Sequence, residues 1–240
     1  ASTVQEAYDM TIRAFELALK FSTPVFVLLD ELIGHMREKV VLHKQNTQNP
    51  ISRPFPKVPP EWYIPYRETA DLISHPAPYN EGFRYNMTGL THDCSGFPTA
   101  VPIEITERLE TLRNKIMAHK REIWDWREYH LSDAKYFIVA YGSAARAARG
   151  AVEFLRNKKI KAGMIDLKSI WPFPDEIVKE LAQKNRSKVV IVAENNMGQL
   201  VHPIREILPH TVKVTQVNRY DGHPLEPRQI VQAVKEEIYA

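Results

Sequence analysis

The sequence predicts an α/β protein whose parallel sheets are covered by helices on both faces, in three layers. Between residues 134 and 240, four apolar runs alternate with four helical patterns. Near the start, a helical pattern is followed by the apolar run Val25–Leu29, which is typical of a parallel strand buried on both faces. A proline-rich stretch separates these two parts of the chain. We therefore expect two α/β parts joined by an irregular connection.

The first helix is predicted from a capping box and an apolar repeat. Thr3 and Glu6 have the spacing of a capping box, and apolar residues then recur at about helical period. The helix should stop near Ser22, because the residue before Pro24 disfavours helical backbone. One helix and one strand cannot form a stable sheet domain alone. Either another chain completes this sheet, or the chain is truncated.

The middle of the chain is predicted to be ordered but irregular up to about residue 105. Ten of the 17 prolines lie between Pro50 and Pro102, which excludes regular helix and central strand there. The same stretch carries the aromatic residues Phe55, Trp62, Tyr63 and Tyr66, so it differs from a disordered tail. From Thr106 to His130 the apolar spacing predicts one long helix. Packing along its own domain is favoured over a coiled coil, and His119 then reads as a hydrogen-bonded core residue.

The last part of the chain reads as a doubly covered parallel sheet. We expect strands at 136–141, 162–167, 189–193 and 212–217, and helices at 144–155, 174–183, 200–208 and 227–239. Strands that alternate with helices imply parallel pairing and right-handed crossovers.

Composition excludes several classes of protein. The chain has 240 residues and a net charge of +3, with the basic excess in residues 134–240 spread between apolar positions, which argues against nucleic-acid binding. Cys94 is the single cysteine, so no internal disulfide, four-cysteine zinc site or cysteine-bound iron–sulfur cluster can form in this chain alone. No apolar run approaches the ~20 residues of a membrane span. With no signal peptide visible, a cytoplasmic location is the default expectation.

Two turns follow predicted strands of the last part. Gly142-Ser143 suits a sharp turn with a helix cap, and this interpretation is favoured over a phosphate site, because neither G-x-G-x-x-G nor a Walker A motif is present. Glu194, Asn195, Gly198 and Gln199 lie in the second turn. For it a structural turn, a subunit contact and a small-molecule site all stay open, in that order of preference.

Two further clusters carry reactive side chains. His92 and Asp93 lie in the densest of these, but adjacent side chains usually diverge, so catalysis by this cluster alone is disfavoured. Asp30, at the end of the Val25–Leu29 run, precedes His35 and Arg37. A solvated salt-bridge cluster is the favoured interpretation there, with an Asp30 that caps the next turn or faces a cleft as the alternative.

Taken together, motifs along the chain resemble the α subunit of 2-oxoacid:ferredoxin oxidoreductases. The resemblance rests on Val4–Thr11, Pro24–Glu31, Gly34–Lys39, Thr88–Asp93 with Gly96, Ala140–Ser143 with Arg146, Trp171–Pro174, Glu194-Asn195 and Gly198-Gln199. These motifs occur in the family's order over nearly the whole chain. They are closer to the 2-oxoglutarate and branched-chain members than to the pyruvate members.

The resemblance implies a thiamine-diphosphate enzyme that oxidatively decarboxylates a 2-oxoacid to acyl-CoA and CO2, with ferredoxin as electron acceptor. It implies a β subunit that shares the cofactor and its Mg and binds most of it, with possible γ and δ subunits and iron–sulfur clusters only in partners. Residues 1–45 would end the pyrimidine-binding domain, 46–133 would be the connection with the long helix, and 134–240 would resemble the carboxy-terminal domain of transketolases. His92 and Asp93 would lie near the substrate. Subunit contacts would come from Asp30, His35, Arg37, Glu194, Asn195, Gly198 and Gln199.

One departure limits what the resemblance assigns. The family's first half of the pyrimidine domain is absent, so this sequence looks like the rear portion of an α subunit and no catalytic residue can be named in it. A non-catalytic assembly subunit with a transketolase-like fold is the alternative. A nucleotide-binding module is a third possibility, but it requires a phosphate loop that the sequence lacks.

Overall fold

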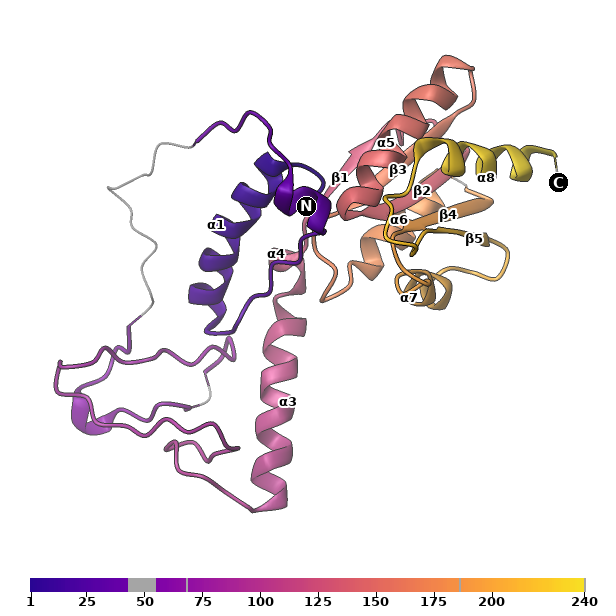
Figure 1. Ribbon diagram of the computed structural model, residues 1–240. Helices are drawn as coiled ribbons and strands as arrows, with labels where there is room; N and C mark the ends of the chain where they lie inside the picture. Colours follow the sequence, from indigo (N-terminus) through magenta and orange to yellow (C-terminus); the bar gives the residue numbers. More distant parts are fainter. Residues whose placement is uncertain (43–54, 68, 186, 240) are drawn as a thin grey trace. The chain divides into compact units, whose positions relative to one another are not determined.

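The computed structural model describes residues 1–42, 55–67, 69–185 and 187–239 (Figure 1). These residues form two compact units, which are described separately. The sheet unit comprises Ala1–Met10, Leu28–Val41 and Ile123–Ala240, and the connecting unit comprises Thr11–Val27 and Leu42–Glu122. Residues 50–54 of the predicted proline-rich connection lie outside the described residues.

A five-stranded sheet forms the centre of the sheet unit. Its strands are β1 (Trp126–Tyr129), β2 (Tyr136–Tyr141), β3 (Ala162–Leu167), β4 (Val189–Glu194) and β5 (Lys213–Asn218). Their order is β1-β3-β2-β4-β5, and all neighbours pair in parallel except β1, which is antiparallel to β3. The four predicted parallel strands are confirmed to within one residue at each end.

Helices cover both faces of this sheet, as the three-layer prediction requires. They are α5 (Gly142–Asn157), α6 (Asp175–Lys184), α7 (Val201–Ile207) and α8 (Pro227–Tyr239). Figure 1 shows α5 and α8 on one face and α6 and α7 on the other. Each face has its own apolar core, and the strand residues alternate between them: Ile138 and Ala140 pack under α5 and α8, whereas Phe137 and Val139 pack under α6 and α7. Strands this apolar on both faces are buried by helices on both faces.

The first helix, α1 (Val4–Phe21), confirms the predicted start and stop. The Glu6 amide donates to Thr3 Oγ1 at 3.1 Å, as a capping box requires, but the Glu6 carboxylate bonds to the Ser2 amide at 2.8 Å instead of the Thr3 amide. A short helix, α2 (Glu31–His35), follows after an extended segment.

For the predicted strand Val25–Leu29, the expectation that the rest of this chain does not complete its sheet is confirmed among the described residues. The segment is extended but pairs with no other strand in the described part of the chain. Phe26 is 84% exposed and Leu28 is 74% exposed. An extended apolar run forms a strand only when a neighbouring strand pairs with its backbone. The described part of the chain provides no such neighbour for this segment.

The prediction of a single helix from Thr106 to His130 is also wrong. The connecting unit holds η1 (Pro60–Trp62) and α3 (Pro102–Ala118), and the one-turn α4 (Lys120–Ile123) ends at the unit boundary. The helix breaks at His119, whose ring nitrogens bond to the Glu122 carboxylate at 2.7 Å and to the Asp71 carbonyl at 3.0 Å. The remainder becomes β1, because an edge strand satisfies the open side of β3.

In the connecting unit, part of the proline-rich segment is ordered by aromatic contacts, as predicted. The Tyr63 hydroxyl donates to the His75 carbonyl at 3.1 Å and accepts from the Ala77 amide at 2.9 Å. The Tyr63 ring packs edge-on against Phe83 and Tyr85. Phe55 and Trp62, by contrast, are exposed. These side-chain bonds replace the backbone ladder that the prolines prevent.

Candidate functional site at the carboxyl edge of the sheet

The strand order creates a switch point beside β2. From β2 the chain crosses to β3 on one side and then to β4 on the other, so the carboxyl ends of β2 and β4 lie next to each other. Ligands of open parallel sheets bind at such a point. The two turns singled out in the sequence, after Tyr141 and after Glu194, both lie here.

An acidic side chain of the sheet unit, Asp30, lies at the carboxyl end of β2. Asp30 Oδ2 accepts a hydrogen bond from the Ser143 amide at 2.5 Å, in the first turn of α5. Gly142 has a φ of +57°, and a Cβ there would lie 2.6 Å from the same Asp30 oxygen. A carboxylate at a helix N-terminus satisfies a free amide and the helix dipole. Asp30 therefore fills the position that a phosphate would take. The predicted cap by Ser143 is wrong, because Ser143 lies inside α5 and its hydroxyl accepts from Asn195 instead.

The turn after β4 is held together from within. Glu194 is fully buried, and its carboxylate accepts hydrogen bonds from the amides of Gln199, Leu200 and Val201 at 3.2, 2.8 and 3.1 Å. These amides begin α7. Gly198 has a φ of +101°, which favours glycine. The internal bonding supports the structural interpretation of this turn, and a subunit contact stays a prediction.

Two side chains tie the turns to each other. Asn195 donates to Ser143 Oγ at 2.6 Å and accepts from the Leu225 amide at 3.0 Å. Asn196 donates to the Tyr141 hydroxyl at 2.7 Å. Burial, and then the negative charge of Glu194, raise the pKa of Tyr141 to about 12. The switch point is thus a closed polar network built of Asp30, β2, β4 and the loop before α8.

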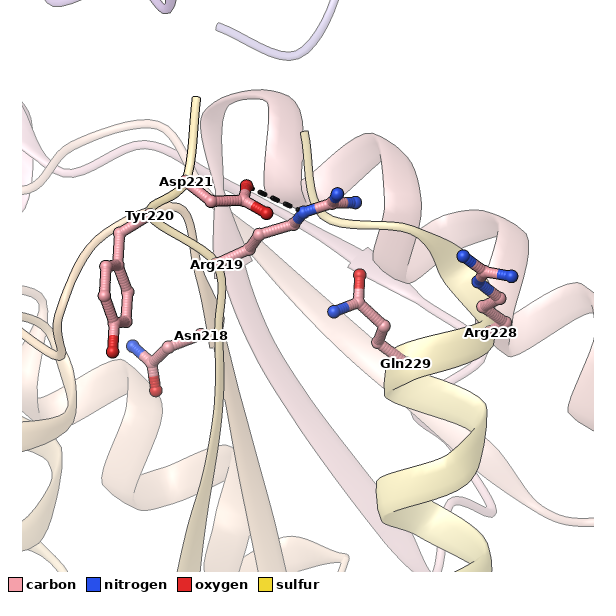
Figure 2. Close-up of a pocket in the computed structure, with 6 residues that line it drawn as sticks. All are labelled: Asn218, Arg219, Tyr220, Asp221, Arg228 and Gln229. Carbon is pink, nitrogen blue, oxygen red and sulfur yellow. Dashed lines mark hydrogen bonds and ion pairs between the residues drawn. The ribbon is translucent and has the colours of Figure 1, made fainter. Parts of the chain in front are cut away.

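A pocket of about 400 Å³ opens beyond the end of β5 (Figure 2). It is lined by Asn218 at the end of β5, by Arg219, Tyr220 and Asp221 in the loop that follows, and by Arg228 and Gln229 in the first turn of α8. Arg219 pairs with Asp221 at 3.0 Å and with Glu226 at 3.1 Å, and Arg228 pairs with Glu226 at 2.7 Å. The two guanidinium charges are balanced by two carboxylates, so this pocket is not a ready anion site.

The remaining predicted residues lie apart from this network. His35 and Arg37 are exposed, at the end of α2 and just after it. His92 and Asp93 belong to the connecting unit, where the His92 ring stacks on Tyr66 with centroids 3.8 Å apart. The Asp93 carboxylate accepts from the Ser95 hydroxyl and from two amides of its own turn, and these bonds hold its pKa below the usual range.

Sequence reasoning missed a buried charge cluster at the end of β3. The Lys168 side chain is 3% exposed, and its ammonium lies 2.6 Å from both Glu6 Oε2 and Asp166 Oδ2. For Glu6, burial raises the pKa, but hydrogen bonds from Lys168 and Ser2 outweigh it and bring the value to about 2. For Asp166, burial outweighs its ion pairs and raises the pKa. The available signal was a charged Asp166 inside a strand that is otherwise apolar.

No group of three or more His, Cys, Asp or Glu side chains in the described parts of the chain is placed to hold a metal ion. No helix among the described residues is long and apolar enough to cross a membrane.

Comparison with known proteins identifies the class to which this α/β fold belongs. Residues 1–111 match the thiamine-diphosphate-binding domain of pyruvate flavodoxin/ferredoxin oxidoreductases, and residues 134–230 match core domain II of pyruvate:ferredoxin oxidoreductase. Both models describe domains of pyruvate:ferredoxin oxidoreductases, so the two matches point to the same class of protein. Individual relatives give a more specific comparison.

The 2-oxoglutarate synthase subunit KorA of Methanocaldococcus jannaschii is 36% identical over 97% of this chain and 61% of its own length. The ketoisovalerate oxidoreductase subunit VorB of Methanothermobacter marburgensis is 28% identical over 98% of this chain and 58% of its own length. A solved 2-oxoglutarate:ferredoxin oxidoreductase from Magnetococcus marinus, with 2-oxoglutarate, coenzyme A and succinyl-CoA bound, covers 99% of this chain. That match has a TM-score of 0.78 at 26% identity and spans 41% of the solved chain.

The chain is therefore similar, along nearly its whole length, to α subunits of 2-oxoacid:ferredoxin oxidoreductases. This confirms the resemblance found in the sequence. The chain spans about 61% of the length of the 2-oxoglutarate synthase subunits that it matches.

Proposed function

We propose that this chain is part of the α subunit of an enzyme that oxidatively decarboxylates a 2-oxoacid. The 2-oxoacid and coenzyme A give acyl-CoA and CO2, and the two electrons released pass to ferredoxin. One observation carries the proposal: the chain aligns along almost its whole length with 2-oxoglutarate synthase subunits at up to 36% identity. The similarity to that group favours 2-oxoglutarate as substrate, with a branched-chain 2-oxoacid second.

The proposal includes thiamine diphosphate with Mg, shared with a β subunit that binds most of it. When bound, thiamine diphosphate would supply the carbanion chemistry that decarboxylation of a 2-oxoacid needs. Iron–sulfur clusters would lie in partner subunits, because this chain has a single cysteine. The further partners are ferredoxin and, in some assemblies, γ and δ subunits, and a cytoplasmic location stays part of the proposal.

Dependence on a second polypeptide is supported by the exposed apolar segment before α2. Leu28 and Leu29 are 74% and 45% exposed, and Leu32, in the first turn of α2, is 43% exposed. Contiguous exposed apolar side chains mark surfaces that another protein covers. We propose the β-subunit contact on this segment and the adjoining Asp30, His35 and Arg37. A second contact is proposed at the turn that holds Glu194, Asn195, Gly198 and Gln199.

His92 and Asp93 are proposed to lie near the substrate. Their alanine variants in the assembled α/β enzyme test this, with turnover and the KM for the 2-oxoacid as readouts. A loss of turnover in either variant supports the placement, whereas near-normal turnover in both overturns it. Because Asp93 organises its own turn, Asp93→Asn is the matched variant that keeps the turn's acceptor oxygen while it removes the charge.

Co-expression with a candidate β subunit tests the function as a whole. Stable association with thiamine-dependent reduction of a dye by 2-oxoglutarate is the expected result. Association with no thiamine-dependent activity, for a complete α chain, would instead establish the alternative of a non-catalytic assembly subunit. Heat stabilisation of the chain by a nucleotide would favour the third candidate, a nucleotide-binding module.

A further inference from the structure

The buried charge cluster at the end of β3 joins two parts of the chain that different family models describe. Glu6, in the thiamine-binding match, is 4% exposed and receives the ammonium of Lys168, in the core-domain match. Arg127 Nη1 lies 3.1 Å from the other Glu6 oxygen. On the far side, Arg149 Nη2 lies 3.8 Å from Asp166 Oδ2. Two carboxylates are thus held among three cations.

Such a cluster fixes geometry more than it adds stability. Replacing a buried ion pair by apolar residues is often neutral, whereas removing one charge leaves the other unpaired and is costly. The cluster therefore permits one placement of the first turn of α1 on the sheet. A displaced α1 would separate Glu6 from Lys168 and leave buried charges without partners.

A second link joins the first turn of α1 to Glu38, at the end of the segment Asp30–Glu38 that contains α2. The Val4 amide, in the first turn of α1, donates to Glu38 Oε2 at 3.0 Å. The other Glu38 oxygen accepts from Arg146 Nη1, on α5, at 2.7 Å. Asp30, at the other end of this segment, accepts a hydrogen bond from the Ser143 amide. The segment between Asp30 and Glu38 is consequently anchored at both ends on the sheet unit.

We propose that Lys168 is a positioning residue for subunit assembly. Lys168 binds Glu6 and so fixes the first turn of α1, which in turn binds Glu38. These contacts hold the Asp30–Glu38 segment in the conformation that the β subunit binds. The inference rests on the proposed function, which places the β-subunit contact on this segment. Core domain II, which holds Lys168 and Arg146, then sets the shape of the contact surface at residues 30–38 in addition to the second contact proposed above.

The test titrates the β subunit against wild-type and variant α subunits of the complete enzyme. Dye reduction by the 2-oxoacid gives an apparent Kd for the β subunit and a kcat at saturation. Lys168→Met is expected to raise that Kd about tenfold while kcat at saturation stays within about twofold. Lys168→Arg, which keeps the charge, is expected to restore most of the affinity. A general loss of structure would lower kcat as well.

Arg146→Gln provides a second variant that leaves the buried cluster intact. It cuts the exposed end of the link, where the Arg146 side chain is 47% exposed, and should weaken β-subunit binding in the same direction. Lys213→Met is the matched control, because the Lys213–Glu237 pair lies within core domain II and its flanking helix. Its Kd is expected to equal that of the wild type.

Hydrogen exchange of the first turn of α1 and of residues 30–38 gives a readout that does not need activity. Faster exchange in Lys168→Met and Arg146→Gln, but not in Lys213→Met, supports the proposal. Wild-type exchange and wild-type affinity in both variants would overturn it. Should the wild-type subunits show no thiamine-dependent activity, the proposed function fails, while the exchange data still decide whether Lys168 positions the segment.

Discussion

Replacing Glu194 by glutamine should destabilise the sheet unit, because one carboxylate serves several donors there. Glu194 Oε2 accepts from the Gln199 and Leu200 amides, and Oε1 accepts from the Val201 amide. A glutamine keeps one acceptor oxygen and turns an NH2 group toward at least one of these buried amides. A hydrogen bond to a charged group contributes ~1.5–3 kcal/mol, so losing one and weakening the others should cost about 2–4 kcal/mol.

Urea unfolding followed by circular dichroism measures this change in the free energy of unfolding. For a protein of this size each kcal/mol lowers Tm by ~2–4 °C, so a Tm fall of about 5–15 °C accompanies it. Met197→Ala is the control in the same turn, since Met197 is 77% exposed, and it should change stability by less than ~0.5 kcal/mol. A Glu194→Gln protein as stable as the wild type would refute the reasoning that this carboxylate holds the start of α7.

Three other outcomes follow from the same structure. The Tyr141 phenol should titrate near pH 12 in an ultraviolet titration. Glu194→Gln removes a neighbouring negative charge and should move the pKa of Tyr141 toward 10. An unchanged pKa would show that burial alone raises it. Glu6, with a folded pKa of about 2, contributes stability that is complete above its unfolded pKa of about 4.5 and is lost as the pH falls toward 2, so the stability gap between wild type and Glu6→Gln should shrink over that range. Gly163→Ala should cost ~1–3 kcal/mol, because its Cβ would lie 2.4 Å from the His130 carbonyl oxygen, whereas Gly89→Ala, with open space around it, should be tolerated.

The polar edge of the sheet was only partly predictable from the sequence. The turns after β2 and β4 were found because glycine and polar residues follow apolar runs there. That Asp30 would occupy the helix terminus at Ser143 depends on a contact 113 residues apart along the chain. The same holds for Lys168 and Glu6, which no local pattern connects.

By itself, the sequence determined the four parallel strands and their helices, because continuous apolar runs such as Phe137–Ala140 can be buried only between two helical layers. It also indicated the similarity to this family, through motifs along the whole chain. Only the tertiary structure decided that residues 126–129 pair with β3 and that Val25–Leu29 pairs with nothing in the described chain. Strand pairing and buried ion pairs depend on which partners lie nearby in space, and residue order alone does not specify that.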